Sequence, residues 1–258
     1  MNNAPIGIFD SGLGGLTVAR AVIDKLPDEE IIYLGDTEHT PYGPRAIAQV
    51  RSLTLSALDE LASRGVKALV IACNTATAAA LPALRETWPD MPIIGVIEPG
   101  SRAACEASPS GDIAVIATES TIRSGAYAEA ILRRRPEAQV RSLACPLFVP
   151  LAEEGWFDGP IAEGVVSRYL EPLFEKSPAP DCLVLGCTHY PFLLPVLERV
   201  VAGRGVTVVD PSPAVARRVV QLLDRSGLHV DPAHRAEYTF RTFADEAYRL
   251  RLEPTHMG

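Results

Sequence analysis

The feature that most constrains the fold is a regular alternation of short apolar runs with longer amphipathic stretches. Eight apolar runs, rich in β-branched residues, have the pattern of strands buried on both faces, which is typical of parallel sheets. They are 5–10, 30–36, 68–73, 92–99, 112–118, 139–145, 182–187 and 206–211. Five stretches between them place apolar residues at i, i+3, i+4 and i+7 and predict helices over 14–26, 46–65, 124–135, 162–176 and 213–227. This alternation predicts a doubly wound α/β fold with parallel sheets.

Two segments of the chain resemble each other and indicate an internal duplication. Residues 69–84 (LVIACNTATAAALPAL) and 183–197 (LVLGCTHYPFLLPVL) both run from a strand through a cysteine to Leu-Pro-x-Leu. The two cysteines, Cys73 and Cys187, are 114 residues apart, and a second pair of loops, around Asp10 and Thr118, is 108 residues apart. We therefore predict two pseudo-symmetric α/β domains.

Two similar strand exits, 96–101 and 208–213, mark where the chain crosses between these domains. Each contains a proline, which fixes φ and discourages helix at the preceding residue. The prediction is a first lobe of residues 1–97 plus 210–258 and a second lobe of residues 98–209. The carboxyl ends of the strands would face a cleft between the lobes, and this cleft is where we expect the active site.

Charge and cysteine content argue against several classes of partner. The net charge is −8, and the one dense basic cluster, Arg133–Arg135, has the pattern of a helix end, so nucleic acid is not expected as a partner. The chain shows neither a secretory leader nor an apolar run of the ~20 residues that span a bilayer, so we expect no membrane partner and a cytoplasmic location. Five widely spaced cysteines form no disulfide framework and no zinc-ligand pattern. No metal is expected, and the thiols should be free.

Cys73 and Cys187 each stand where a buried strand gives way to a helix. Helix N-terminal N–H groups favour negative charge, and the pKa of a thiol in such a place can fall to roughly 3.5–7.5. Cys105, Cys145 and Cys182 have the pattern of inert, buried residues. Two thiols on opposite walls of a cleft suit proton transfer: one thiolate takes a proton from a carbon acid while the other thiol donates one to the opposite face. This exchange inverts a stereocentre.

Other polar residues near the strand ends are candidate helpers. Asp10 would assist Cys73, His189 would assist Cys187, and Glu153 or Glu154 would add a carboxylate. Each also has a structural interpretation, since Asp10 can cap a turn, a lone histidine is often structural, and the glutamates can be helix surface.

The expected substrate is small and anionic. Hydroxyl and amide groups would bind its carboxylates, and they belong to Ser11, Asn74, Thr75, Thr118, Thr121 and Thr188. Tyr42 and Gly43 lie on a Pro-Tyr-Gly turn that could close over the site. The glycine-rich DSGLGGL segment lacks nucleotide-binding spacing, and Lys25, Lys67 and Lys176 are poorly placed for a Schiff base, so no cofactor is expected.

At this point the motifs resemble those of bacterial glutamate racemases, in the aspartate/glutamate racemase superfamily, from about residue 5 to residue 225. The resemblance lies in IGIFDSGLGGLTV, DTEHTPYGPR, IACNTATAAAL, GVIEPG, VPLAEEG, VLGCTHYPFLLP and VVDPS. It implies that Cys73 takes the α-proton from the D-isomer and Cys187 from the L-isomer. Asp10, Glu153 and His189 match supporting ionisable positions. The implied substrate-binding residues are Asp10, Ser11, Tyr42, Gly43, Asn74, Thr75, Thr118, Thr121, Thr188 and His189.

The resemblance further implies an isomerase that interconverts L- and D-glutamate without a cofactor. Such an enzyme would supply D-glutamate for peptidoglycan biosynthesis, and through it for cell wall biogenesis and cell shape, and relatives commonly form homodimers. Three alternatives stay open from the residues alone. They are a related enzyme acting on aspartate, a hydantoin or a malonate, a two-lobed amino-acid-binding protein, and a thiol-redox protein.

Overall fold

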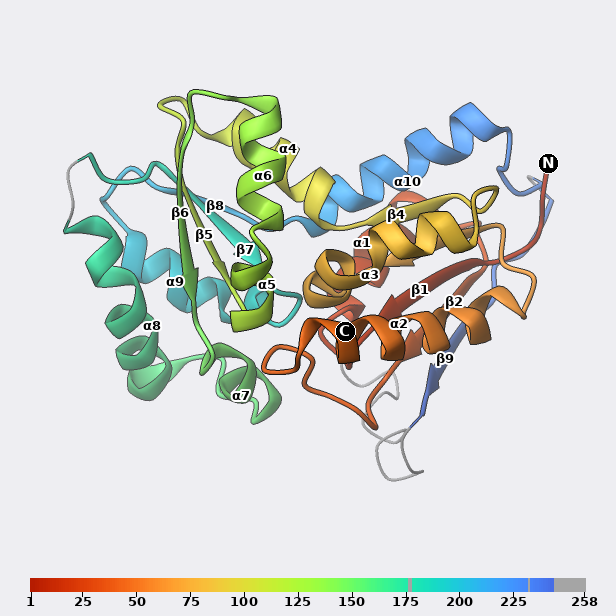
Figure 1. The fold of residues 1–258 in the computed structure, drawn as a ribbon, viewed down its shortest axis with the longest axis horizontal. Helices are drawn as coiled ribbons and strands as arrows, with labels where there is room; N and C mark the ends of the chain where they lie inside the picture. Colours follow the sequence, from red (N-terminus) through yellow and green to blue (C-terminus); the bar gives the residue numbers. More distant parts are fainter. Residues whose placement is uncertain (176–177, 232, 244–258) are drawn as a thin grey trace.

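The protein forms two parallel sheets, each flanked by helices. The structure is a computed structural model, and it describes residues 1–258 except 176–177, 232 and 244–258. Figure 1 shows the two sheets as two halves of the molecule side by side, and every described strand pair in them is parallel. The predicted fold, an α/β protein with two parallel-sheet domains, is confirmed.

The strands of each sheet are close to those predicted from the apolar runs. The first sheet has the order β4 (Ile93–Gly95), β3 (Ala68–Ile71), β1 (Ile6–Asp10), β2 (Ile31–Gly35) and β9 (Tyr238–Thr242). The second has the order β6 (Gln139–Ala144), β5 (Asp112–Ala117), β7 (Cys182–Gly186) and β8 (Thr207–Val209). β1, β3, β5 and β7 are buried at every residue, because helices cover both faces of each sheet.

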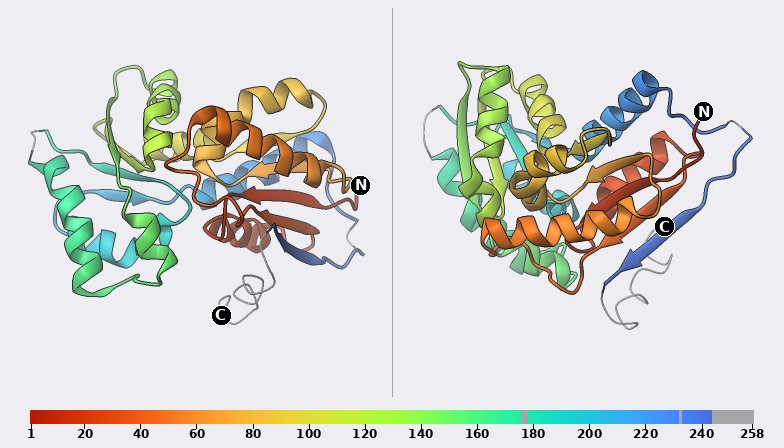
Figure 2. Two further views of the ribbon diagram at one scale, coloured as in Figure 1. Left: turned by 60° about the horizontal axis from the view of Figure 1, so that its bottom comes forward. Right: turned by 45° about the vertical axis from the view of Figure 1, so that its right-hand side comes forward.

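The two sheets share one strand order. β2-β1-β3-β4 in the first sheet corresponds to β6-β5-β7-β8 in the second, which supports the predicted pseudo-symmetry. The first sheet has one more strand, β9, which extends its edge beside β2 (Figure 2). No sequence pattern had indicated β9, whose residues are only partly buried because it has a neighbour on one side only.

Helices cover both faces of both sheets. They are α1 (Leu16–Lys25), α2 (Ile47–Ala62), α3 (Asn74–Thr87), α4 (Ile97–Ala107), α5 (Glu119–Ser124), α6 (Ala126–Arg134), α7 (Phe148–Glu153), α8 (Gly159–Phe174), α9 (Leu194–Val201) and α10 (Ser212–Ser226), with a 3₁₀ turn at Tyr190–Leu193. On the first sheet, α2 and α3 pack against one face and α1 and α10 against the other. On the second, α7, α8 and α9 pack against one face and α4 and α6 against the other. None of the helices within the described residues is long and apolar enough to cross a membrane.

The predicted secondary structure of the first lobe crossing is wrong. The expected strand 92–99 ends at Gly95, and α4 begins at Ile97, so Glu98 is helical although Pro99 follows it. Pro99 lies in the first turn of α4, where a backbone N–H has no partner within the helix and its loss costs little. At the second crossing Pro211 occupies the N-cap position of α10, so the helix begins after this proline, as expected for a residue that discourages helix at the position before it. The lobe boundaries themselves, at 97/98 and 209/210, stay a prediction.

Candidate active site

The candidate catalytic residues lie at the carboxyl ends of the central strands of both sheets. Asp10 ends β1 and Cys73 follows β3 as the N-cap of α3. In the second sheet Thr118 follows β5 as the N-cap of α5, and Cys187 directly follows β7. In each sheet two neighbouring strands, β1 and β3 or β5 and β7, are followed by helices that pack on opposite faces of the sheet. Open α/β sheets bind ligands at the carboxyl ends of such a strand pair.

Cys73 is a buried thiol with two hydrogen-bond partners. Its sulfur donates to the Ser11 hydroxyl at 3.4 Å and accepts from the Ala76 N–H at 3.4 Å. Burial and the nearby Asp10 carboxylate raise the pKa of Cys73 to about 12, despite the Ser11 and Ala76 hydrogen bonds. The expected lowering of this pKa by the helix N-terminus is therefore wrong for the substrate-free protein, because desolvation outweighs the helix N–H groups.

Cys187 begins a three-residue chain of polar groups. Its sulfur lies 3.9 Å from His189 Nδ1, and His189 Nε2 lies 2.5 Å from Glu153 Oε1. Burial opposes charge on the ring, but the hydrogen bonds to Cys187 and Glu153 more than offset it and raise the pKa of His189 to about 10. The imidazolium is then the stable form at neutral pH, and it places a positive charge beside the Cys187 sulfur. Glu153, rather than Glu154, reaches the ring.

Asp10 connects the two lobes. Its carboxylate accepts from the Gly12 N–H at 3.0 Å and from the Thr188 hydroxyl, in the other lobe, at 3.3 Å. Complete burial raises the pKa of Asp10, while His189 and these hydrogen bonds oppose the rise. The turn-capping and functional interpretations of Asp10 thus both have a structural basis.

Hydroxyl and amide groups from both lobes meet beside the thiols. The hydroxyls of Thr75, Thr118 and Thr121 lie 2.9–3.1 Å from one another. Asn74 Oδ1 accepts from the Tyr127 hydroxyl at 2.7 Å. Thr75 and Asn74 come from α3, whereas their partners come from the second lobe, so this cluster spans the junction between the lobes.

The Pro-Tyr-Gly turn reaches the same junction. Tyr42 is buried, and its hydroxyl donates to Asp36 Oδ2 at 2.6 Å. Burial raises the pKa of Tyr42, and the negative charges of Asp36, Cys73 and Asp10 add to the rise. The Gly43 carbonyl accepts from the Ser120 N–H, and a Cβ on Gly43 would lie 2.9 Å from Thr118. Asp36 and Tyr127, which hold Tyr42 and Asn74, were not identified from the sequence.

The two sulfurs border different hydrophobic clusters but interact electrostatically with each other. Cys73 belongs to the α2/α3 cluster and Cys187 to the α7/α8/α9 cluster. Negative charge on Cys187 nevertheless contributes to raising the pKa of Cys73, behind burial and Asp10. Cys73 is 4% exposed and Cys187 is 7% exposed. Both sulfurs are therefore almost completely shielded from solvent in this structure.

Gly14, in the first lobe, lies close to His189 and Thr188. A Cβ at position 14 would lie 2.6 Å from both His189 Nδ1 and Thr188 Oγ1. We expect Gly14→Ala to displace His189 and to lower kcat about 10²-fold, the cost of misplacing a catalytic group by about 1 Å. Gly164→Ala is the matched control, because a Cβ there meets nothing within 4 Å. Equal activity of the two variants in steady-state kinetics would contradict this geometry.

Comparisons with known proteins agree with this arrangement. The sequence model of the Asp/Glu/Hydantoin racemase family matches residues 16–219. Glutamate racemase of Corynebacterium diphtheriae is 46% identical over 258 residues, which cover 100% of this chain and 96% of that protein. The crystal structure of glutamate racemase isoform RacE1 from Bacillus anthracis has a TM-score of 0.92 at 37% identity and covers 98% of this chain and 94% of its own. Glutamate racemase from Francisella tularensis in complex with D-glutamate has a TM-score of 0.89 at 35% identity, covering 96% and 91% of the two chains. The chain therefore belongs to the Asp/Glu/hydantoin racemase family and, within it, to the glutamate racemases, isomerases that racemise an amino acid.

Proposed function

We propose that the chain interconverts L- and D-glutamate by direct proton transfer at the α-carbon, with Cys73 and Cys187 as the two acid/base groups and no cofactor. The observation that carries this proposal is the matched placement of the two thiols after β3 and β7, with Asp10 acting electrostatically on both Cys73 and His189. A two-fold related pair of thiols is suited to a substrate whose two enantiomers are related by inversion.

The proposed reaction moves one proton at each sulfur. In the L-to-D direction the Cys187 thiolate takes the α-proton and becomes a thiol, leaving a carbanion at the α-carbon. The Cys73 thiol then donates its proton to the opposite face and becomes a thiolate. The D-to-L direction runs the same two transfers in reverse, so the two sulfurs exchange protonation states with each turnover.

The protonation of the substrate-free site fits the L-to-D direction. A Cys73 pKa of about 12 keeps this thiol protonated and ready to donate at neutral pH. The positively charged ring of His189 lies beside Cys187, the sulfur that takes the proton in this direction. The supporting roles proposed here for His189, Glu153 and Asp10 are to balance charge at the two sulfurs.

For substrate binding we propose the lining residues expected from the sequence, namely Asp10, Ser11, Tyr42, Gly43, Asn74, Thr75, Thr118, Thr121, Thr188 and His189. All are buried at or beside the junction between the lobes, and most offer uncharged donors suited to carboxylates. A relative of known structure was solved with D-glutamate bound, which supports glutamate as the substrate.

We also propose the wider setting that the family resemblance implies. The D-glutamate formed would supply peptidoglycan biosynthesis, the enzyme would act in the cytoplasm, and two copies would form a homodimer. The lobe division at 97/98 and 209/210 is part of the same proposal, with closure of the lobes enclosing the substrate.

One assay tests the proposed reaction. Purified protein incubated with L-glutamate and no added cofactor should bring the optical rotation to zero, because the two enantiomers are equally stable and the equilibrium constant is one. L-Aspartate under the same conditions should show no comparable change. Racemisation of L-aspartate in place of L-glutamate would favour the aspartate-specific relative, and binding of L-glutamate without racemisation would favour the binding protein.

A further inference from the structure

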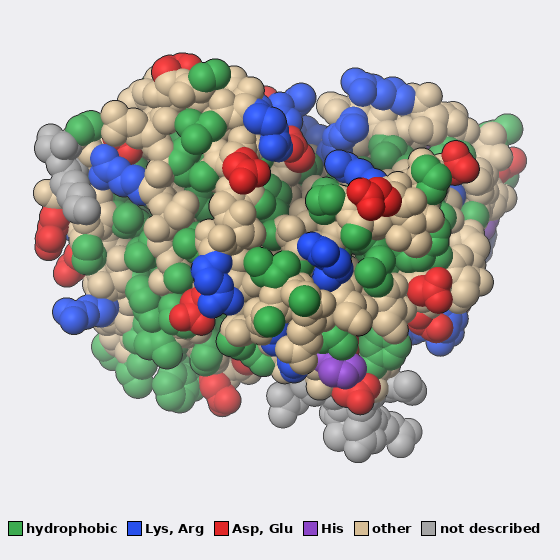
Figure 3. Space-filling view, in the orientation of Figure 1, with side chains coloured by type: hydrophobic (Ala, Val, Ile, Leu, Met, Phe, Trp, Pro, Cys, Tyr) green, Lys and Arg blue, Asp and Glu red, His purple; other side chains and the backbone are tan. Residues whose placement is uncertain are grey.

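Tyr127 is a buried polar residue at the junction between the lobes, and the proposed reaction gives it no part. In Figure 3 charged side chains of both signs lie at the upper centre, where the two halves of the molecule meet, whereas Tyr127, on α6, is only 3% exposed. Its hydroxyl donates to Asn74 Oδ1 at 2.7 Å, and Asn74 belongs to α3 of the first lobe. One buried hydrogen bond thus joins α6 to the residue that follows Cys73.

The glycines around Tyr127 leave just enough room for its side chain. A Cβ on Gly100 would lie 3.1 Å from the Tyr127 hydroxyl oxygen, and a Cβ on Gly186 would lie 3.2 Å from the ring. Both separations are shorter than ordinary van der Waals contact between heavy atoms, so α4 and the end of β7 press closely on the ring. The hydroxyl therefore has little freedom to move away from Asn74.

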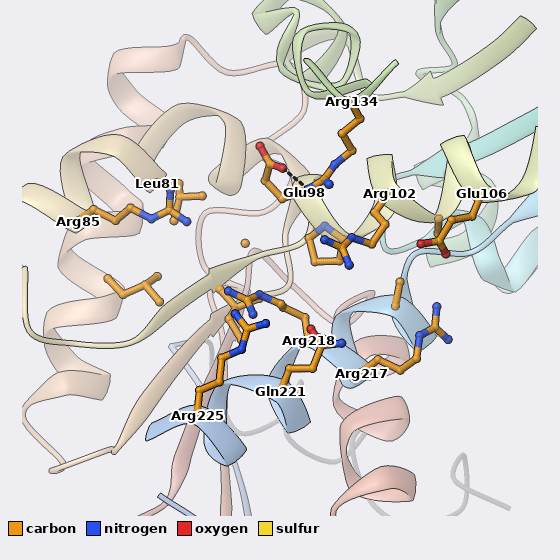
Figure 4. A pocket seen from close by; sticks show the side chains of 16 residues that line it. Leu81, Arg85, Glu98, Arg102, Glu106, Arg134, Arg217, Arg218, Gln221 and Arg225 are labelled. Carbon is orange, nitrogen blue, oxygen red and sulfur yellow. Dashed lines mark hydrogen bonds and ion pairs between the residues drawn. The ribbon is translucent and has the colours of Figure 1, made fainter. Parts of the chain in front are cut away.

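The helix that carries Tyr127 is also held in place. Tyr127 and Ile131, both on α6, belong to one hydrophobic cluster with residues of α4. At the end of α6, Arg133 and Arg134 pair with Glu98 of α4, and Figure 4 shows Arg134 reaching Glu98 beside the cavity that these two residues line. Tyr127 is therefore part of a rigid support for Asn74.

The hydrogen bond fixes which end of the Asn74 amide faces away from Tyr127. Burial, with the negative charges of Asp210 and Cys187, raises the pKa of Tyr127 well above its ordinary value, so the hydroxyl keeps its proton. Among the described residues, Asn74 Oδ1 is the acceptor for that proton. Turning the amide over would leave a buried hydroxyl without an acceptor, which is costly. The oxygen of Asn74 is thus held on Tyr127, and its NH₂ group is left for another partner.

The NH₂ group of Asn74 is available where the substrate is expected. Within the part of the chain that the structure describes, no hydrogen bond engages this group. Asn74 directly follows Cys73, and it borders a void of about 10 Å³ together with Cys187 and Thr188. Asn74 therefore adjoins both thiols. An NH₂ group donates hydrogen bonds to a carboxylate, whereas an amide oxygen would repel it.

We propose that Tyr127 is a positioning residue, which holds the oxygen of Asn74 and so directs the Asn74 NH₂ group toward a carboxylate of glutamate. The inference rests on the proposed function, because it takes Asn74 as a substrate-binding residue. Tyr127 acts only through Asn74 and does not contact the reacting atoms. It strengthens binding because the amide is already fixed in the binding orientation before glutamate arrives.

A double-mutant cycle with Tyr127→Phe and Asn74→Ala tests the proposal. Phenylalanine keeps the buried ring and removes only the hydroxyl. Isothermal titration calorimetry with racemic glutamate measures binding, since racemisation leaves an equal mixture unchanged. Asn74→Ala should weaken binding about 30-fold and Tyr127→Phe about tenfold, in the range expected for a hydrogen bond to a charged group. In the Asn74→Ala background, Tyr127→Phe should add less than about twofold, because its partner is already missing.

Steady-state kinetics gives a second measurement. Tyr127→Phe should raise KM about tenfold and leave kcat within about threefold, the pattern of a lost interaction that is equal in ground and transition states. Tyr238→Phe is the matched control, because its hydroxyl donates to the Pro27 carbonyl at 2.7 Å, outside the candidate site, and both constants should stay at the wild-type values. Circular dichroism and thermal denaturation establish that each variant is folded.

Three results would overturn the proposal. They are additive effects of the two substitutions on binding, wild-type affinity in Tyr127→Phe, and a fall in kcat with KM unchanged. The proposed function fails separately: wild-type protein that binds glutamate without racemising it would contradict the reaction, while the binding cycle would still decide the role of Tyr127. Wild-type protein that does not bind glutamate would contradict both.

Discussion

Replacing either Cys73 or Cys187 with alanine is expected to lower kcat for glutamate racemisation by about 10³-fold or more. Each thiol is the sole acid/base group on its face of the α-carbon in the proposed reaction, and positioned acid/base catalysis contributes ~10²–10⁴ in rate. Loss of one thiol should stop both directions, because each direction needs one sulfur to take a proton and the other to give one. Polarimetry or a coupled assay for D-glutamate measures the effect.

Both variants should remain folded. Each substitution removes a single sulfur atom at the edge of its hydrophobic cluster, where Cys73 is 4% exposed and Cys187 is 7% exposed. Cys105→Ala is the matched control, since this half-buried thiol lies on α4 and lines neither strand end. Normal turnover by a folded Cys187→Ala variant would show that the reaction does not need two thiols.

The second large effect is expected for His189→Asn, which should lower kcat about 10²-fold or more. Asparagine keeps a hydrogen-bonding group near Cys187 but cannot carry the positive charge that balances a thiolate. The ring of His189 is positive below its pKa of about 10 and loses this charge as the pH rises through that value. Wild-type kcat should therefore decline as the pH passes about 10, and this alkaline decline should be missing in His189→Asn.

His229→Asn provides the control for this experiment. His229 pairs with Asp224 at 2.8 Å and with Glu29 at 3.6 Å, and neither pair involves a residue of the candidate site, so its replacement should leave kcat and the pH profile unchanged. A His189→Asn variant with the wild-type alkaline decline would assign that decline to another group and remove the proposed role of His189.

The sequence predicted the positions of the functional groups along the chain better than their electrostatics. Short apolar runs that end in Asp10, Cys73, Thr118 and Cys187 became buried strands with those residues at their carboxyl ends. This works because both the burial of a central parallel strand and the place where it ends depend on local sequence. The repeated cysteine segments likewise predicted a pseudo-symmetry that is now visible in the strand orders.

Features that depend on distant contacts could not be predicted in the same way. The raised pKa of Cys73 comes from burial and from Asp10, on another strand, so the local helix N-terminus gave the wrong direction. Tyr127 holds Asn74 from a position 53 residues away, and no spacing rule indicates that pair. α4 was missed because Pro99 suggests a break, although proline is well tolerated in a first helical turn.

The most direct test of the two-thiol proposal follows the α-hydrogen of L-glutamate during the first few per cent of conversion in D₂O. With two separate acid/base groups, the D-glutamate formed should carry deuterium from the donating thiol, while the unreacted L-glutamate keeps its α-protium. Mass spectrometry after chiral separation distinguishes the two pools. D-Glutamate that retains the substrate's own α-protium would mean that a single group carries the proton from one face to the other, and it would contradict the two-thiol account.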